Sequence, residues 1–211
     1  MSSSNTVKGL LQYMIDNGIP ITTTIADLIT IEQSDASKLN ATVTNAILEK
    51  KGKPFKGTAN FSRPADAVGY AIGDAISDST SSPTIMTMDL SSYGVEEDDF
   101  VAITNAYIVE STKLENNSWV KMFISAYDFG ATNDNEEFGL SDSEAQKDSI
   151  VLSINDTIRT ANNTILRADI LVPPIIKVTD SSSLYVALQA DSYFTAGNNS
   201  RWDVFINGVI L

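Results

Sequence analysis

From residue 55 onward, apolar and polar residues alternate with a period of two. Side chains of a β-strand point in turn to the two faces of its sheet, so this pattern predicts half-buried strands. In the segment 119–127, one face would carry Val120, Met122, Ile124 and Ala126. In the segment 202–211, one face would carry Trp202, Val204, Ile206, Gly208 and Ile210. We expect the first face to lie in the core and the final strand to be paired inside a sheet or buried at an interface.

Clusters of turn-forming residues divide this region into pieces of strand length. The predicted strands are 57–62, 70–76, 84–89, 100–111, 118–127, 149–155, 164–171, 184–190 and 202–211. No helical pattern separates them. Strands at this spacing predict a mainly β fold, an antiparallel β-sandwich of the jelly-roll type.

Residues 1–54 follow a helical period and form a predicted helical N-terminal extension, distinct from a β-sandwich domain at 55–211. The pattern predicts an amphipathic helix at 6–16 and another from Ser34 or Asp35 to about Lys51. Between them, apolar spacing favours a helix from about Thr24, whereas the β-branched content also suits a strand. Short helices are marginal alone, so the extension would pack against the main domain or dock on another subunit.

The chain contains neither cysteine nor histidine, which restricts its chemistry. No disulfide or thiolate site can form, and both the commonest general base and the commonest transition-metal ligand are missing. The Gly-X-Ser-X-Gly motif of a nucleophile elbow is absent as well. We therefore expect a non-enzymatic protein without catalytic residues, cofactor or dedicated metal site.

The formal net charge is -13, which opposes binding of a phosphate backbone. The only basic run, 49–56, lies beside Gly and Pro, and we expect it to be a solvated linker. The sequence contains no apolar stretch long enough to span a bilayer, and its start does not resemble a secretory leader. These features predict a soluble protein made in the cytoplasm, with neither nucleic acid nor membrane as a partner.

Acidic residues are concentrated between positions 128 and 148. They are Asp128, Asp134, Glu136, Glu137, Asp142, Glu144 and Asp148. Oxygen-rich loops can bind calcium, but this spacing does not match the EF-hand loop. The segment is interpreted as a solvated surface loop or short helix, with a cation site as the alternative.

The most distinctive segment is 61–76. Its motif residues are Phe61, Arg63, Pro64, Asp66, Tyr70, Gly73 and Asp74. Pro64 would end one strand, and Tyr70 would open a second strand that is kinked at Gly73. Because Asp66 and Asp74 are close to Arg63 in sequence, a charge-assisted pair would fix this corner. We interpret the segment as a structural corner, and a ligand-contacting arginine is the alternative.

The pattern Phe-X-Arg-Pro-X-Asp followed by Tyr-X-X-Gly-Asp-X-Ile resembles the opening of a β-domain found in small virion proteins of tailed bacteriophages. The resemblance covers residues 61–76, and the strand-rich remainder is compatible with it. It implies a β-sandwich on the outside of the particle, without catalytic residues. The helical extension at 1–54 departs from the shortest members, which leaves open a capsid cement protein or a longer head-fibre or tail component.

Two functions follow as expectations. The first is a capsid decoration or cement protein located on the capsid surface of the virion, whose partners are the major capsid protein and copies of itself as a dimer or trimer. The second is a receptor- or carbohydrate-binding module of a head fibre or tail. Exposed aromatic rings would serve the second function, and the candidates are Trp119, Tyr127, Tyr185, Tyr193 and Trp202.

Overall fold

The computed structural model describes residues 51–66, 68–114, 117–143, 145–179 and 181–211. The helices predicted at 6–16, from Thr24 and from Ser34 lie outside these residues. The division of the chain into an extension at 1–54 and a domain at 55–211 therefore stays a prediction.

Strands dominate the part of the chain that the structure describes. They are β1 (Pro54–Ser62), β2 (Ala75–Ile76), β3 (Met86–Asp89), β4 (Phe100–Glu110), β5 (Val120–Ser125), β6 (Ile150–Arg159), β7 (Thr164–Ala168), β8 (Ile175–Lys177), β9 (Ser183–Ala190) and β10 (Arg201–Ile210). The short helical elements are η1 (Ser91–Tyr93) and α4 (Ala145–Asp148). The predicted mainly β fold class is confirmed.

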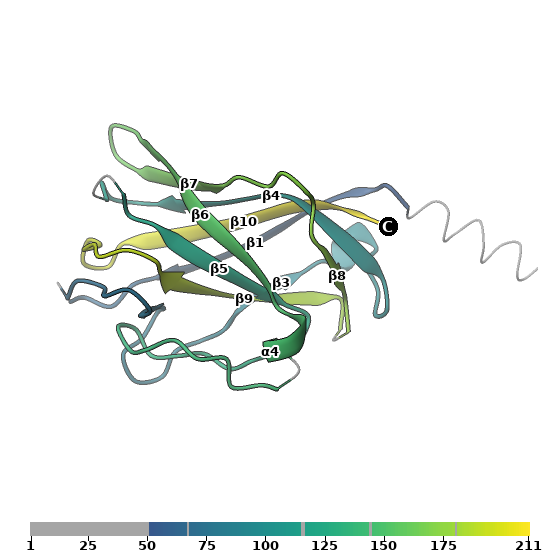
Figure 1. Cartoon of the computed structure of the whole chain (residues 1–211), viewed down its shortest axis with the longest axis horizontal. Helices are drawn as coiled ribbons and strands as arrows, with labels where there is room; N and C mark the ends of the chain where they lie inside the picture. The colour runs from purple at the N-terminus through teal and green to yellow at the C-terminus, as the bar shows by residue number, and fades with distance from the viewer. Residues whose placement is uncertain (1–50, 67, 115–116, 144, 180) are drawn as a thin grey trace, which may run out of the picture. The chain divides into compact units, whose positions relative to one another are not determined.

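The strands form one antiparallel sheet that curls into two layers (Figure 1). The first layer has the order β1-β10-β4-β7, with β8 also paired to β4. The pairing of β7 with β6 leads into the second layer, β6-β5-β9, and β2 and β3 pair in turn with β9. Most successive long strands thus lie in opposite layers, which is the arrangement of a jelly-roll sandwich.

The free edges of the curled sheet, β1 and β3, come together on one side of the sandwich. Gly57 of β1 makes this approach possible, because a Cβ at this position would lie 2.8 Å from the sulfur of Met88 in β3. A larger residue at position 57 would fit only if the flexible end of the Met88 side chain moved away.

The core is built from the inward faces of both layers. Val120, Met122, Ile124 and Ala126 are all buried, as the alternation predicts. In β10, residues 202, 204, 206, 208 and 210 are buried while their neighbours are partly exposed. The strand is paired on both sides, with β1 and with β4, so the prediction that it lies inside a sheet is confirmed.

The strand predicted at 70–76 is wrong for most of its length. Only Ala75–Ile76 is a strand, and Tyr70 makes an isolated bridge to Phe194. Gly73 has φ +101, a conformation that L residues rarely adopt, so the chain turns there instead of continuing as a strand. The sequence placed a kink at Gly73 but kept it inside a strand, whereas the chain turns there.

Two other segments also differ from the sequence-based expectation. β1 begins at Pro54, so the basic run 49–56 is in part a strand, and Lys56 lies over the ring of Phe205 at 5.0 Å. β8 was not predicted, because two prolines precede it and only three residues pair with β4. Neither the length nor the flanking residues of so short an edge strand give a clear pattern.

The acidic segment 128–148 is packed against the domain rather than fully solvated. Phe129 and Ala145 of this segment form a small cluster with Tyr185 of β9, and Phe138 and Leu140 pack against it. The segment, which includes α4, therefore packs on β9 through apolar side chains (Figure 1).

Candidate functional site

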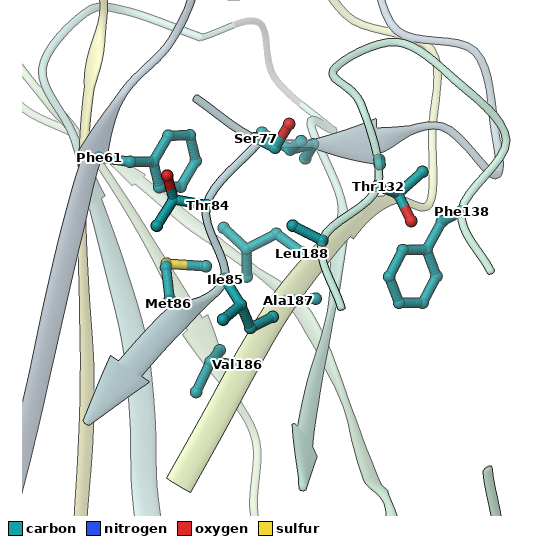
Figure 2. A pocket seen from close by; sticks show the side chains of 13 residues that line it. Phe61, Ser77, Thr84, Ile85, Met86, Thr132, Phe138, Val186, Ala187 and Leu188 are labelled. Carbon is teal, nitrogen blue, oxygen red and sulfur yellow. The ribbon is translucent and has the colours of Figure 1, made fainter. Parts of the chain in front are cut away.

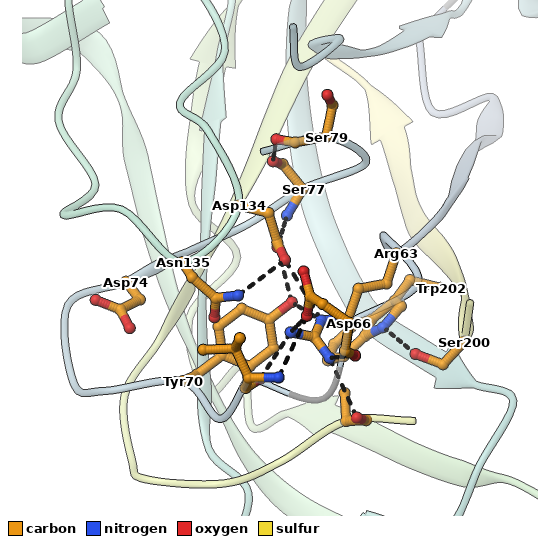
Figure 3. Close-up of polar contacts among 12 residues, drawn as sticks. Arg63, Asp66, Tyr70, Asp74, Ser77, Ser79, Asp134, Asn135, Ser200 and Trp202 are labelled. Atoms are coloured by element: carbon orange, nitrogen blue, oxygen red, sulfur yellow. Dashed lines mark hydrogen bonds and ion pairs between the residues drawn. The ribbon is translucent and has the colours of Figure 1, made fainter. Parts of the chain in front are cut away.

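Arg63 lies directly after β1 and turns its side chain inward, where it is fully buried. Its backbone amide donates to the Ser200 carbonyl at 2.9 Å, which ties the end of β1 to the turn before β10. The guanidinium donates to Tyr70 Oη at 2.6 Å, to the Val68 carbonyl at 2.7 Å and to Asp66 Oδ1 at 2.8 Å. The planar fork of an arginine can serve several acceptors at once, and this site uses that property (Figure 3).

Tyr70 connects Arg63 to the acidic segment. Its hydroxyl accepts the hydrogen bond from Arg63 Nε and donates to Asp134 Oδ1 at 2.7 Å. Burial raises the pKa of the Tyr70 hydroxyl, and the charge of Asp134 raises it further. The phenol therefore stays protonated and keeps its role as a donor.

Asp134 is the acidic partner that the sequence did not reveal. It is 3% exposed, accepts from the Ser77 amide at 2.9 Å and forms an ion pair with Arg63 at 3.4 Å. Burial raises the pKa of its carboxyl, although the hydrogen bonds from Ser77 and Tyr70 and the charge of Arg63 oppose the shift. Nothing in the sequence separates Asp134 from the other acids of 128–148, because its role depends on a contact between distant segments.

The other motif residues support the same corner. Asp66 contacts Arg63, whereas Asp74 does not: its Oδ2 accepts from the Ala71 amide at 2.6 Å and stabilises the turn at Gly73. Phe61 stacks on Trp202 with 6.1 Å between ring centroids, and the Pro64 carbonyl accepts from the Asn199 amide. The cluster joins the end of β1 to segments near Tyr70, Asp134 and Ser200.

A small cavity lies between β2, β3, β9 and the acidic segment (Figure 2). Its lining is mainly apolar, with Ile85, Met86, Phe138 and Leu188 among the contributors. Its water-accessible volume is about 20 Å³, room for about one water molecule. A cavity of this size cannot hold an organic cofactor.

Within the described ranges, no group of three or more acidic side chains is arranged to hold a metal ion. Asp134 of the segment 128–148 is buried and belongs to the cluster around Arg63, whereas a cation site on the remaining carboxylates stays an untested alternative. No helix in the described part of the chain is long and apolar enough to cross a membrane.

The candidate aromatic residues are not equally placed. Trp202 and Tyr185 are buried, whereas Trp119 is 43% exposed and Tyr193 is 73% exposed. The segments of these two rings are joined, because the Trp119 amide donates to Ser192 Oγ at 2.7 Å and the Asp191 amide donates to the Trp119 carbonyl at 2.9 Å. Two of the five predicted rings are thus exposed on neighbouring segments, and the fifth candidate, Tyr127, is half-buried.

A second exposed surface lies at the other end of β10, on the outer face of the first layer. We call it the apolar shelf, and it consists of Phe100, Ile175, Val209 and Leu211. Their neighbours Val101, Ile176 and Ile210 are buried in the core, so the alternation turns the shelf residues outward. Phe100, Ile175 and Leu211 are 48%, 57% and 44% exposed. Groups of exposed apolar side chains often mark an interaction surface.

The domain is an acidic β-sandwich of the jelly-roll type, with a buried polar cluster around Arg63. No protein-family model matches the chain, and no curated protein matches it. Among solved structures, it is similar to a chain described as "Israeli acute paralysis virus heated to 63 degree - full particle", at 10% identity and a TM-score of 0.30, over 75% of this chain and 68% of that chain. A TM-score this low does not establish a common fold, and we infer nothing about function from it.

Proposed function

We propose that this chain is a non-enzymatic structural protein of a tailed-phage virion that binds the outside of the capsid and stabilises it. The apolar shelf is the observation that carries the proposal, because an acidic protein that exposes Phe100, Ile175 and Leu211 together has a surface suited to a protein partner. The jelly-roll arrangement, which viral capsid domains and lectins also use, is compatible with this role but does not define it. The motif at 61–76 adds the resemblance to phage virion proteins.

The buried cluster of Arg63, Tyr70 and Asp134, which we call the Arg63 corner, supports a structural rather than a catalytic role. Arg63, Tyr70 and Asp134 bond to one another inside the domain, so these three groups do not face a substrate. A catalytic site needs such groups within reach of a substrate.

A shell-binding assay tests the proposal. The full chain is added to expanded, empty phage shells that lack it, and bound copies are counted after sedimentation. We expect binding at a fixed number of copies per shell and a higher melting temperature of the shells. Absence of binding, or binding that leaves shell melting unchanged, would contradict a stabilising role.

The second candidate function is a receptor- or carbohydrate-binding module, which the exposed Trp119 and Tyr193 favour. Aromatic rings can stack on the apolar faces of sugars, and Ser192 and Asp191, which precede Tyr193, bond to the backbone of Trp119. A glycan panel distinguishes this function. Binding that Trp119→Ala and Tyr193→Ala both abolish, without any effect on shells, would favour the second candidate over the first.

A further inference from the structure

We propose that the capsid partner contributes an extended segment that binds between β8 and the start of β6 as an additional strand. This binding mode rests on the proposed function, in which the chain binds a capsid. It is indicated by two open strand edges, a groove between them and the apolar floor of that groove.

β8 leaves one of its edges open. The Ile103 amide donates to the Pro174 carbonyl, and the amide of Val178 is bonded on the same side. Residues that bond to the neighbouring strand alternate along an antiparallel ladder, so the backbone groups of Ile175 and Lys177 point away from β4. No other described strand pairs with β8, which makes this edge available to another chain.

The first residues of β6 leave an edge open as well. The Asp191 amide donates to the Trp119 carbonyl, so odd-numbered residues of β5 bond to β9 and even-numbered ones bond to β6. The backbone groups of Val151 and Ser153 therefore point away from β5. Among the described strands they have no partner on that side, because the pairing of β6 with β7 begins only at Ile154.

A groove lies between β8 and the start of β6. Ile175 and Lys177 of β8 line one bank, and Lys147 of α4 and Ile150 of β6 line the other. The water-accessible volume of the groove is about 370 Å³. An extended main chain that enters it can bond to β8 on one side and to β6 on the other, which is how an added strand is recognised.

The floor of the groove is apolar. Ile176 is buried in the core, Ile150 packs against the same core, and Tyr127 is half-buried. A charged side chain placed on this floor would lose its hydration without a partner. Because side chains of a strand alternate between its two faces, the bound segment should carry apolar residues at every second position.

The charges on the two banks balance. Lys177 pairs with Asp98 at 2.5 Å on the β8 bank, and Lys147 is followed by Asp148 on the other. These four charges cancel, although the whole chain has a net charge of -13. An uncharged segment is therefore the best match, since an acidic one would be repelled by the chain as a whole.

The groove is continuous with the apolar shelf. Ile175 belongs to both, because its side chain is 57% exposed on the shelf and also lines the groove. Leu171 and Val172, in the connection that leads into β8, are 87% and 80% exposed. A strand bound along β8 thus extends the surface that the proposed function assigns to the capsid.

Paired substitutions at position 177 test the strand pairing. Lys177→Ala and Lys177→Pro both remove the lysine, but only proline removes the amide that bonds to the added strand. Proline is tolerated on an edge strand where the amide faces solvent, so β8 should be retained. In the sedimentation assay with empty shells, Lys177→Pro should bind about 10-fold more weakly than Lys177→Ala, because an acceptor of the bound segment is left unpaired.

Thr87 of β3 provides the matched control. It is exposed and does not line the groove. Its backbone groups also point away from the neighbouring strand, because the Leu90 amide donates to the Ser182 carbonyl. Thr87→Pro and Thr87→Ala should therefore bind shells equally. Equal binding of the two variants at position 177, or a proline effect of the same size at position 87, would overturn the added strand.

Hydrogen exchange of the unaltered chain, measured by mass spectrometry, tests the same pairing without a substitution. On shells, the amides of Val151 and Lys177 should exchange about 10-fold more slowly than in the free chain, and that of Thr87 should be unchanged. This measurement decides the question if urea unfolding shows that Lys177→Pro does not fold. Unchanged exchange at Val151 or Lys177 would overturn the added strand.

The same shells separate this binding mode from the proposed function. If Lys177→Pro binds and stabilises shells as well as Lys177→Ala does, the added strand is wrong and the capsid role remains. If the unaltered chain does not bind shells, both are wrong. Slow exchange at Lys177 in a concentrated solution of the chain without shells would assign the groove to a second copy and would also overturn the capsid segment.

Discussion

At the scale of single residues, the Arg63 corner illustrates how a buried charge is tolerated. The guanidinium is removed from water, but two carboxylates, a phenol and backbone carbonyls take the place of its hydration. Desolvating a charge costs several kcal/mol unless such partners are present. The sequence predicted Asp66 as a partner from its proximity in the chain, but it could not predict Asp134, which is 71 positions away and reaches the site only through the fold.

Arg63→Ala should lower the free energy of unfolding by about 3–5 kcal/mol, because it leaves Asp134 buried without its cation. Arg63→Lys should recover only part of this loss, since an ammonium cannot serve the same set of acceptors. Urea denaturation measures both changes. Arg167→Ala is the matched control: its pair with Asp156 is half exposed on both sides, and its loss should cost under about 1 kcal/mol. Equal effects of the two alanine variants would contradict a stabilising corner.

The raised pKa of the Asp134 carboxyl predicts how the stability of the protein depends on pH. Burial raises its folded-state pKa above the unfolded value, so on acidification the folded protein takes up a proton there before the unfolded chain does. The stabilisation that protonated Asp134 adds to the free energy of unfolding is therefore fully present at acidic pH, and it is lost as the pH rises through the folded-state pKa. The stability difference between wild type and Asp134→Asn should shift in favour of wild type as pH falls. Urea unfolding at several pH values measures this slope, and a difference that is constant with pH would contradict the raised pKa.

At the scale of elements, the sequence predicts strands well where one face is buried along the whole length. The inward faces of β5 and β10 agree with the alternation because apolar burial decides the orientation of both strands. Prediction fails where backbone geometry decides instead. Gly73 turns the chain in the middle of a strand-like pattern, and β8 is held by only a few backbone pairs next to two prolines.

The register of β10 against β4 shifts between Asn207 and Gly208, and this irregularity depends on the glycine. A Cβ at position 208 would lie 2.3 Å from the Ala102 carbonyl oxygen and 2.5 Å from the Phe55 ring. Because the backbone of β4 cannot yield easily, Gly208→Ala should cost about 1–3 kcal/mol in unfolding free energy. Gly139→Ala is the control, since no atom lies within 4 Å of its added carbon, and its effect should stay within about 0.5 kcal/mol. A melting temperature for Gly208→Ala equal to that of the control would show that the strand can repack.

At the scale of the whole domain, the strand order is the part that the sequence does not determine directly. Alternation and turns identify the class of fold, but the pairing of β1 with β10 and of β4 with β7 joins segments far apart in the chain. Such pairings depend on how both layers fit around a common core, which local patterns do not encode. The polar corner has the same origin, because Arg63, Asp134 and Ser200 meet only once these strands are in place.

The pairing of β1 with β10 gives a test of the predicted domain boundary. β10 lies between β1 and β4, and the Gly52 amide donates to the Ile210 carbonyl at 2.7 Å, so the ladder already begins before Pro54. If the predicted division of the chain is correct, a fragment of residues 51–211 should unfold cooperatively, as measured by circular dichroism during heating. A fragment of residues 63–211 lacks Phe55 and Phe61 from the core and leaves one side of β10 unpaired, so it should fail to fold or should aggregate. A cooperative transition in the shorter fragment would contradict a closed sandwich, whereas an unfolded longer fragment would mean that residues before 51 are part of the same folding unit.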